Sequence, residues 1–372
     1  MGSIDYRRNI SRISPTVPHG GSGRPVANSD IRTSIACPNG TDWHTAREIR
    51  GTAARTCDFT RTILMDTDKP AEAPPAFSVF NYCVCFLDIL GQRHALRDQG
   101  LLPWITTEEQ RLTFVDEVLK KTIRPITRLQ TQTNQFVETF LKRSDSQTRQ
   151  SLPPDLREEW DKVQEKQLCV QYWSDGLVAF SCLGNKEAPV QINGAFALIG
   201  MAGSLCLMNL GHQFRNPIRG GIEIAWGTEL RPGELYGPAI ARSYELESEV
   251  AQYPRIAVGA RMIEFLKAVD ALPPTDKPSR YSATMAKMCL QMLLRDLDGQ
   301  WIIHYLGDAF REAVSRHEHL GMYEDALKFI SEEYVRFRTA GDSKLAMRYF
   351  QLLSYFQHHP PKAPPHAVTD VA

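Results

Sequence analysis

Two aspartates occupy positions where a carboxylate can bind a metal ion. Asp88 ends the apolar run 82–87 and is followed closely by Gly91, as expected for an acid presented at the end of a strand. Asp175 lies in Trp-Ser-Asp-Gly between two short apolar runs, a pattern typical of a β-hairpin with a tight turn. Two carboxylates on rigid strand ends can bind Mg²⁺ or Mn²⁺, hard cations that prefer oxygen ligands and share them with substrate phosphates.

Each aspartate taken alone also has a purely structural explanation. Asp88 would then be an ordinary acid at a strand end. Asp175 would be a turn former, because Asp-Gly is among the commonest hairpin sequences. The two residues together, each in its own distinctive frame, favour metal binding.

The surrounding pattern predicts strands that alternate with helices. A strand ends at Asp88, and a helical pattern follows a capping box expected at Thr106-Thr-Glu-Glu109. Further elements are expected at 168–182 (hairpin), 192–210 (helix), 218–226 (strand), 238–252 (helix), 256–258 (strand), 261–269 (helix) and, after a turn at 298–299, a last strand. This order predicts an α+β fold, with helices on one face of a mostly antiparallel sheet.

The chain divides into four expected segments. Residues 1–75 are rich in Ser, Thr, Arg, Gly and Pro and are predicted to be mostly disordered, because they cannot bury enough apolar surface to offset the entropy of ordering. Residues 76–310 are the main domain, with an inserted helical segment at about 105–165. Apolar stripes at helical spacing predict a helical extension over 311–359, and 360–372 is expected to be a disordered tail.

The composition suits a soluble protein with a large core. The chain has 372 residues, 42% of them hydrophobic, and 43 basic residues balance 43 acidic ones. Because there is no excess of positive charge, we expect no binding to nucleic acid or to an anionic membrane surface. The eight cysteines form no Cys-x-x-Cys pair and the N-terminus has no apolar signal sequence, which favours a cytoplasmic location.

One stretch, 192–211, is about long and apolar enough to imitate a membrane span. Asn193 and Asn209 bracket it, no basic cluster flanks it, and it is rich in Gly, Ala and Ser. Small residues let a helix lie close to a sheet or to a partner helix. We therefore predict a core helix that is buried or faces a dimer partner.

Four segments, in this order, resemble the catalytic domain of the class III nucleotide cyclases. They are Phe86-Leu-Asp-Ile-Leu-Gly91, Ser174-Asp-Gly-Leu-Val-Ala-Phe180, Arg219-Gly-Gly-Ile-Glu-Ile-Ala-Trp-Gly227 and Gly237-Pro-Ala-Ile-Ala-Arg-Ser-Tyr-Glu-Leu-Glu-Ser248. Residues 245–256 are especially similar to the pyrimidine cyclases of the Pycsar antiphage system. The resemblance covers roughly residues 78 to 310 and implies a ferredoxin-like βαββαβ core.

The resemblance also implies a reaction and a set of ligands. Two Mg²⁺ or Mn²⁺ ions would be held by Asp88, Asp175 and the backbone carbonyl of Ile89, and would assist attack of the ribose 3′-hydroxyl on a nucleoside triphosphate. Backbone amides after Gly91, at the start of a helix, would contact the phosphates. Because the family builds its site between two domains, a head-to-tail homodimer is expected.

One of the two positions that read the base departs from the adenylate cyclases. Gln171 stands where they carry lysine, four residues before the second metal aspartate, and Glu234 stands at the position of their acidic partner. A neutral amide can both donate and accept, so Gln171 suits a base edge other than that of adenine. The alternative is that Gln171 is an ordinary polar strand residue. The sequence favours a pyrimidine triphosphate, UTP ahead of CTP.

The position of the arginine that stabilises the transition state also departs from the family. The purine cyclases carry Asn and Arg where this chain has Ala241 and Glu245. An arginine at the reacting phosphate contributes a large electrostatic stabilisation, so another arginine must take its place if the domain is active. The candidates are Arg219, Arg231, Arg242 and Arg255. Arg255 is equally explained as a structural salt bridge, and Arg219 as a solvated strand end.

These features predict a cytoplasmic pyrimidine nucleotide cyclase that makes a cyclic monophosphate and pyrophosphate. By resemblance, the product would act on a separate effector in antiphage defence. Three alternatives stay open: a catalytically inactive homologue that senses nucleotide or dimerises, a purine nucleotide cyclase, and a metal-dependent nucleotidyltransferase that joins two nucleotides.

Overall fold

The computed structural model describes residues 78–97, 100–101, 103–139, 146–162, 168–184, 188–211, 215–314 and 319–361. The predicted disordered segment 1–75, and all but the first two residues of the predicted tail 360–372, lie outside the described residues.

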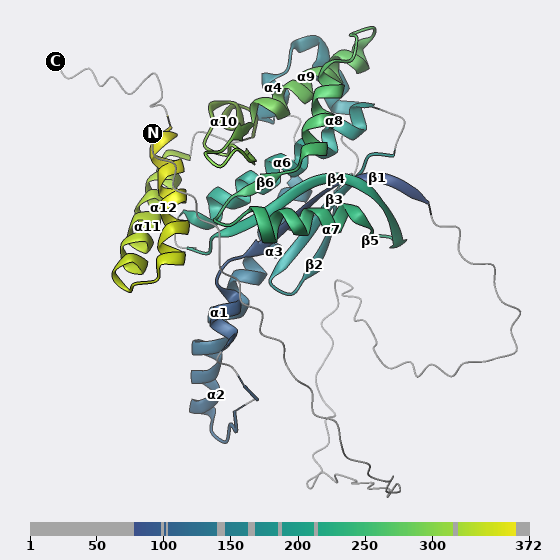
Figure 1. Cartoon of the computed structure of the whole chain (residues 1–372). Coiled ribbons are helices and arrows are strands. Elements are labelled where there is room, and N and C mark those ends of the chain that lie inside the picture. Colours follow the sequence, from purple (N-terminus) through teal and green to yellow (C-terminus); the bar gives the residue numbers. More distant parts are fainter. Residues whose placement is uncertain are drawn as a thin grey trace, which may run out of the picture. The chain divides into compact units, whose positions relative to one another are not determined.

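An eight-stranded sheet forms the centre of the described part (Figure 1). Its strands are β1 (Val79–Ile89), β2 (Cys169–Trp173), β3 (Gly176–Cys182), β4 (Ile218–Arg231), β5 (Glu234–Tyr236), β6 (Ile256–Val258), β7 (Leu293–Arg295) and β8 (Trp301–Ile303). Their order is β2-β3-β1-β4-β6-β8-β7, with β5 paired to β4. Among the described strands only β4 and β6 pair in parallel, so the prediction of an α+β fold with a mostly antiparallel sheet is confirmed.

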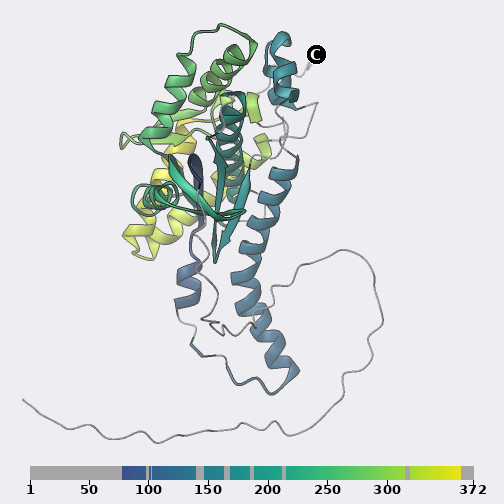
Figure 2. The same cartoon turned by 90° about the vertical axis from the view of Figure 1, so that its right-hand side faces the viewer.

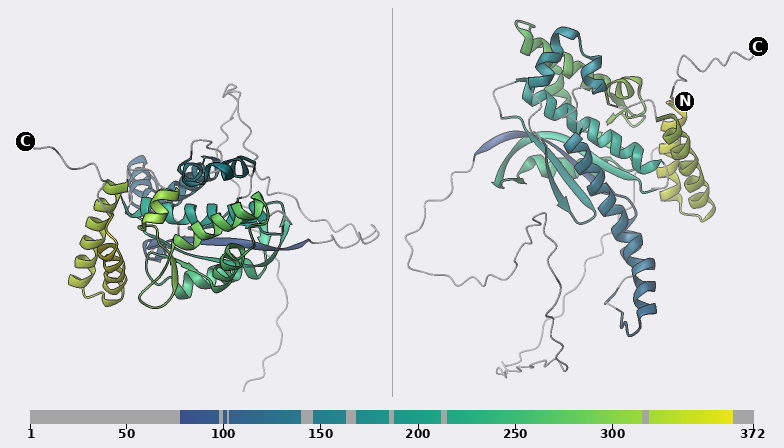
Figure 3. Two further views of the ribbon diagram at one scale, coloured as in Figure 1. Left: turned by 90° about the horizontal axis from the view of Figure 1, so that it is seen from above. Right: turned by 180° about the vertical axis from the view of Figure 1, so that it is seen from behind.

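Helices cover both faces of this sheet, not one face as the sequence suggested. Alternate residues of β1 point to opposite faces: Cys85 and Leu87 pack into the core that includes helix α6 (Ala188–Leu210), whereas Val84 and Phe86 pack toward helix α7 (Pro238–Glu245). In Figure 1 α7 lies in front of the sheet; the right-hand view of Figure 3, which looks from behind, shows α6 on the opposite face. Burial on both faces explains why β1 is an almost continuous apolar run instead of an alternating one.

Helix α6 is the core helix predicted from the small-residue stretch. It is long and apolar enough to cross a membrane, but 83% of its window Gln191–Leu210 is buried inside the protein, which is consistent with a soluble protein. Its bracketing asparagines have partners: the hydroxyl of Tyr281 donates to Asn193 over 2.6 Å, and Asn209 donates to Gln132 over 3.0 Å. The polar groups are therefore satisfied within the core.

The segment between β1 and β2 is helical. It contains α1 (Gln92–Arg97), α2 (Glu108–Phe114), a π-helical turn (Val115–Leu119), α3 (Lys120–Thr139), α4 (Gln147–Ser151), a 3₁₀ turn (Pro154–Leu156) and α5 (Arg157–Lys162). Figure 2 shows α2 and α3 as one long rod. The capping box predicted at Thr106 lies one residue later: Thr107 accepts from the backbone of Gln110, whose side chain returns the bond.

The remaining helices follow β4. A π-helical turn (Leu246–Val250) continues α7, and α8 (Ala260–Asp270), α9 (Lys277–Gln291) and α10 (Asp308–Val314) lead to a hairpin of α11 (His319–Thr339) and α12 (Ser343–His358). The turn predicted at 298–299 joins β7 to β8.

Candidate active site

The structure brings Asp88 and Asp175 to the same edge of the sheet. Strand β1 lies between β3 and β4, so Asp88 is flanked by Gly176 on one side and by Arg219 on the other. The backbone N–H of Ile89 donates to the carbonyl of Asp175 over 3.4 Å. The two carboxylates predicted to act together thus lie side by side, one on β1 and the other in the turn that leads into the adjacent strand β3.

In the turn that contains Asp175, the left-handed residue is Ser174, and the glycine has another role. The positive φ of 46° falls on Ser174, not on the glycine. A Cβ at Gly176 would meet the carbonyl oxygen of Leu87 at 2.6 Å. Glycine is therefore needed here because the backbones of β1 and β3 lie so close, and this closeness fixes Asp175 beside the end of β1.

Arg219 is the arginine that lies at the two acids. Its Nη2 is 3.7 Å from Asp88 Oδ2, and its Nε forms a closer ion pair with Glu247. The side chain of Arg219 is 18% exposed, whereas that of Glu247 is 2% exposed. The buried carboxylate of Glu247 therefore fixes the Nε side of the guanidinium, while the Nη2 side lies near Asp88.

Glu247 was not singled out by the sequence, yet it completes this cluster. It lies in the π-helical turn after α7, on the same helix face as the buried Ala239 and Ser243. Gly221 allows this helix to approach the sheet, since a Cβ there would meet the carbonyl oxygen of Ser243 at 2.3 Å. An acid at a buried helix position is the signal that could have identified Glu247, because such acids are rarely buried without a partner.

The cluster holds more negative than positive charge. Burial, and then the neighbouring carboxylates of Glu247 and Asp175, raise the pKa of Asp88 to about 7, against the effect of Arg219, which lowers it. Burial also raises the pKa of Glu247, against the effect of Arg219. Neighbouring carboxylates repel one another when they are ionised, and a bound cation would reduce this repulsion.

The donor set suits a hard divalent ion only if other ligands complete it. Asp88 and Asp175 offer carboxylate oxygens, and Ile89 offers a carbonyl at the same edge. No group of three or more His, Cys, Asp or Glu side chains that could hold a metal ion occurs among the described residues. Magnesium sites commonly use one or two carboxylates with water and substrate phosphates, which fits this set.

Two other predicted residues, Gly91 and Gln171, have different surroundings. Gly91 is an exposed left-handed residue with φ of 94° before α1, which spans only six residues. Gln171 pairs with Val178, which pairs with Phe86, so it lies on the face of the sheet that also carries Asp88. The Oε1 of Gln171 is buried and accepts no hydrogen bond from any described residue.

Glu234 is not brought to the acids within one chain. It starts β5, where it lies 3.9 Å from Arg231 at the far end of β4. Arg219 lies near the beginning of the same strand, so the separation is roughly 40 Å along the strand. A role for Glu234 beside Asp88 would need a second copy of the chain.

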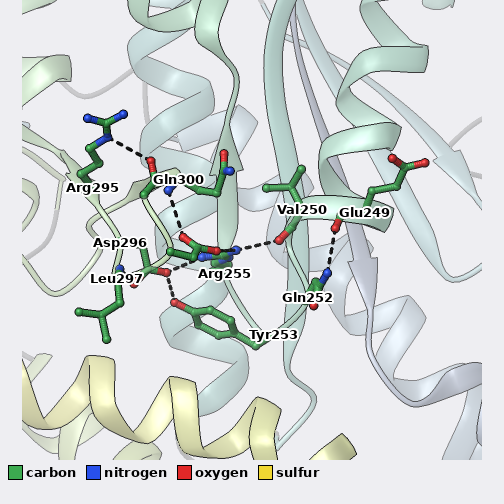
Figure 4. Close-up of polar contacts among 11 residues, drawn as sticks. Glu249, Val250, Gln252, Tyr253, Arg255, Arg295, Asp296, Leu297 and Gln300 are labelled. Atoms are coloured by element: carbon green, nitrogen blue, oxygen red, sulfur yellow. Dashed lines mark hydrogen bonds and ion pairs between the residues drawn. The ribbon is translucent and has the colours of Figure 1, made fainter. Parts of the chain in front are cut away.

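Of the remaining arginines, Arg242 is exposed on α7 and Arg255 is structural. Figure 4 shows Arg255 between two carboxylates: its Nη1 lies 2.5 Å from Asp296, and its Nη2 lies 2.5 Å from Asp298 and 2.8 Å from the carbonyl of Val250. Its guanidinium also stacks over the ring of Tyr253 at 4.6 Å. The structural explanation of Arg255 is therefore the one that its contacts support.

Comparison with known proteins gives no family assignment. No protein-family model matches this sequence, and a search of curated proteins finds no match. Function is therefore inferred from the sequence motifs and from the geometry of this site.

Proposed function

We propose that this protein is a nucleotide cyclase that converts a pyrimidine nucleoside triphosphate, UTP ahead of CTP, to the 3′,5′-cyclic monophosphate and pyrophosphate. One observation carries the proposal: Asp88 on β1, Asp175 in the turn that leads into β3, and Arg219 on β4 lie together at one end of the sheet. The same residues lie in three of the segments that resemble class III cyclases, in the family's order. A ferredoxin-like cyclase core over 76–310 is part of this proposal.

The chain's own residues have distinct roles in the proposed reaction. Asp88, Asp175 and the carbonyl of Ile89 would hold Mg²⁺ or Mn²⁺, which when bound lowers the pKa of the 3′-hydroxyl and neutralises charge on the phosphates. The 3′-oxygen attacks the α-phosphorus, the bond to pyrophosphate breaks, and the hydroxyl proton leaves to solvent. Arg219 would stabilise charge on the reacting phosphates, and Glu247 fixes its guanidinium.

A head-to-tail homodimer is proposed because one chain does not gather all the predicted residues. Glu234 of one copy would contribute to base recognition at the acids of the other. Trp173 and Tyr244, which are 42% and 52% exposed, both pack edge-on against Phe86 next to the acids. Exposed aromatic side chains of this kind are enriched in protein interfaces. Light scattering of the active enzyme should show a dimer, and a fully active monomer would contradict the arrangement.

Base selection is proposed to rest on Gln171. No described residue donates a hydrogen bond to its buried amide oxygen, so this oxygen can accept one from the base. A pocket built on such groups rejects a base that leaves them unpaired. The experiment is incubation with Mn²⁺ and an equimolar mixture of ATP, GTP, CTP and UTP, with products identified by mass spectrometry. Cyclic UMP is expected. Cyclic AMP or cyclic GMP as main product would reject the base assignment and leave the cyclase assignment standing.

A cytoplasmic location and a role in antiphage defence, through an effector that responds to the product, are proposed from the resemblance alone. In the assay with the four triphosphates, Asp175→Asn serves as the control for a contaminating enzyme.

A second candidate is an inactive homologue that binds nucleotide. Ala241 and Glu245 stand where the purine cyclases carry Asn and Arg, and the pairing of Arg219 with Glu247 engages the arginine that would replace them. Nucleotide binding in calorimetry without any product from the four triphosphates would favour this candidate over the cyclase.

A further inference from the structure

The rod formed by α2, the π-helical turn and α3 packs against the rest of the protein over its second half only. In that half Leu129 and Thr133 are 2% and 0% exposed, and Leu129 belongs to the main core. In α2 and the π-helical turn, by contrast, no side chain is buried. Figure 2 shows this first half of the rod extending beyond the sheet. A partner can therefore approach it.

Exposed apolar side chains lie along the uncovered part of the rod. Leu112 is 51% exposed and Ile123 is 46% exposed, and Leu119 between them is half-buried. Leu112 and Ile123 are about three turns apart, and the π-helical turn between them changes their relative direction by roughly a quarter turn. Both therefore fall within one broad face of the rod, which suits packing against a second helix.

The charges of the rod are divided between its two ends. Residues 108–117 contain four acidic side chains and one arginine, whereas residues 118–128 contain four basic side chains and no acid. Two of these acids and two of these bases are exposed and form no ion pair with any described residue: Glu109, Glu117, Lys121 and Arg124. The rod thus has an acidic end and a basic end with charges that the chain itself leaves unpaired.

This division of charge selects a second copy of the rod in the antiparallel direction. A parallel copy would place acid beside acid and base beside base. An antiparallel copy places each acidic end beside a basic end, and a twofold axis makes both contacts identical. With the axis between residues 117 and 118, Leu112 of one copy lies level with Ile123 of the partner subunit. Glu109 then lies within one turn of Arg124 of the partner subunit.

Packing would also stabilise a helix that has little support of its own. Helices of only a few turns are marginal in water, and most helical stability in proteins comes from packing of an apolar face. The capping box at Thr107 fixes the start of α2, but it covers no apolar side chain. A partner helix on the face of Leu112 would remove that side chain from water.

We propose that residues 108–128 bind the same segment of a second copy of this chain, antiparallel and about a twofold axis near residues 117 and 118. This contact does not rest on the proposed function. It uses other residues than the head-to-tail contact at Trp173 and Tyr244, so each contact can be tested without the other. The helical segment between β1 and β2 is then an assembly element.

The first test is Leu112→Glu in the full chain, with the molar mass measured by light scattering over a range of concentrations. The variant should raise the Kd of the contact about 100-fold or more, because the twofold axis places two unpaired carboxylates in one apolar contact. Its mass should be half that of wild type where wild type is assembled. Val335→Glu is the control, since Val335 is 50% exposed on α11, and its mass should match wild type. An unchanged mass in Leu112→Glu would overturn the proposal.

The second test exchanges charges between the two ends of the rod. Glu109→Lys and Arg124→Glu alone should each raise the Kd about tenfold, because each places two like-charge contacts across the axis. The two substitutions in one chain should return the Kd to within about twofold of wild type, since opposite charges then meet again. Neither side chain has an ion pair within the described chain, so only the partner can explain this recovery. A double variant as weak as the product of the single effects would reject the antiparallel contact.

Folding and turnover are recorded for the same proteins. If Leu112→Glu melts early, the charge exchange decides, because Glu109 and Arg124 are exposed and their substitution should leave the fold intact. A wild type that is monomeric at every working concentration would overturn the contact. Absence of cyclic product from an assembled wild type would reject the proposed function and leave the contact standing.

Discussion

Two arginines stand side by side at the same edge of the sheet, and their surroundings differ. The carbonyl of Arg255 accepts from the backbone N–H of Gly220, the residue after Arg219, so the two lie on neighbouring chain segments. Arg255 is 4% exposed and has Asp296 and Asp298 at 2.5 Å. Arg219 is 18% exposed and lies among three acids: it pairs with Asp88 and Glu247, and Asp175 lies beside Asp88.

The charges of the Arg255 cluster are paired within the protein, whereas the Arg219 cluster keeps repelling charges that a ligand would stabilise. Around Arg255 both terminal nitrogens donate to carboxylates or a carbonyl of the protein, so the positive charge is neutralised within the fold. Around Arg219 like charges lie next to one another, because the carboxylates of Asp88, Asp175 and Glu247 share one end of the sheet. Functional sites are where such unfavourable groupings are kept, because the ligand resolves them.

The largest effect should come from removing one acid of the Arg219 cluster. Asp88→Asn is expected to lower turnover by at least about 1000-fold, because a carboxamide is a poor substitute for a carboxylate ligand of a divalent ion. Its stability should not fall, since one of several crowded acids is neutralised without a change of shape. Product formation and the denaturation midpoint are the two measurements. Near wild-type turnover with Mg²⁺ or Mn²⁺ would show that the site is misassigned.

The Arg255 cluster should respond in the opposite way. Arg255→Leu leaves Asp296, whose side chain is only 10% exposed, without its cationic partner and with the hydroxyl of Tyr253 alone, so the free energy of unfolding should fall by about 3 kcal/mol in urea titrations. Arg231→Leu is the control, because the side chain of Arg231 is 84% exposed and its loss should change stability by less than about 1 kcal/mol. Equal effects of the two substitutions would remove the distinction between the clusters.

A smaller effect is expected where the helix meets the sheet. Gly221→Ala places a Cβ 2.3 Å from the carbonyl oxygen of Ser243, so the helix must move and take Glu247 away from Arg219. Stability should fall by about 2–3 kcal/mol, and turnover should fall with it. Gly321→Ala, in open space within α11, should be neutral or slightly stabilising. Thermal melts and initial rates compare the two variants, and unchanged turnover in a folded Gly221→Ala would argue against a positioning role for Glu247.

The smallest expected effect concerns the anchoring of the C-terminal hairpin of α11 and α12, where His304 Nδ1 lies 3.0 Å from the hydroxyl of Tyr355. Burial, and then the charge of His359, lowers the pKa of His304 to about 4 from its usual 6.5. Because the folded state resists protonation, this histidine leaves stability intact above pH 6.5 and reduces it as the pH falls from 6.5 toward 4. A loss of about 1–2 kcal/mol at pH 5 relative to pH 7 is expected, less than the full shift implies because His304 is partly exposed.

His304→Gln is the matched variant for this pH dependence. It cannot take up the proton, so its stability should fall less between pH 7 and pH 5 than that of wild type. Identical pH profiles of unfolding in the two proteins would mean that His304 does not hold the hairpin in the expected protonation state.

The sequence by itself determined the features that depend on short stretches of chain. Apolar runs and turn residues predicted the strand that ends at Asp88, the hairpin that carries Asp175, and the buried helix 192–210, and these elements are present in the structure. Periodicity and turn chemistry act over a few residues, so they can be read locally. The one-residue error in the capping box shows the usual limit of such boundaries.

Only the tertiary structure decided which charges meet. The register of β1 against β4 places Arg219 beside Asp88, the close approach at Gly221 brings Glu247 to both, and the length of β4 keeps Glu234 away. Each contact joins residues more than 20 positions apart, or depends on how closely a helix lies on the sheet. Strand register and packing of this kind are set by the whole core at once, so no local pattern could distinguish Arg219, which serves the candidate site, from Arg255, which serves the fold.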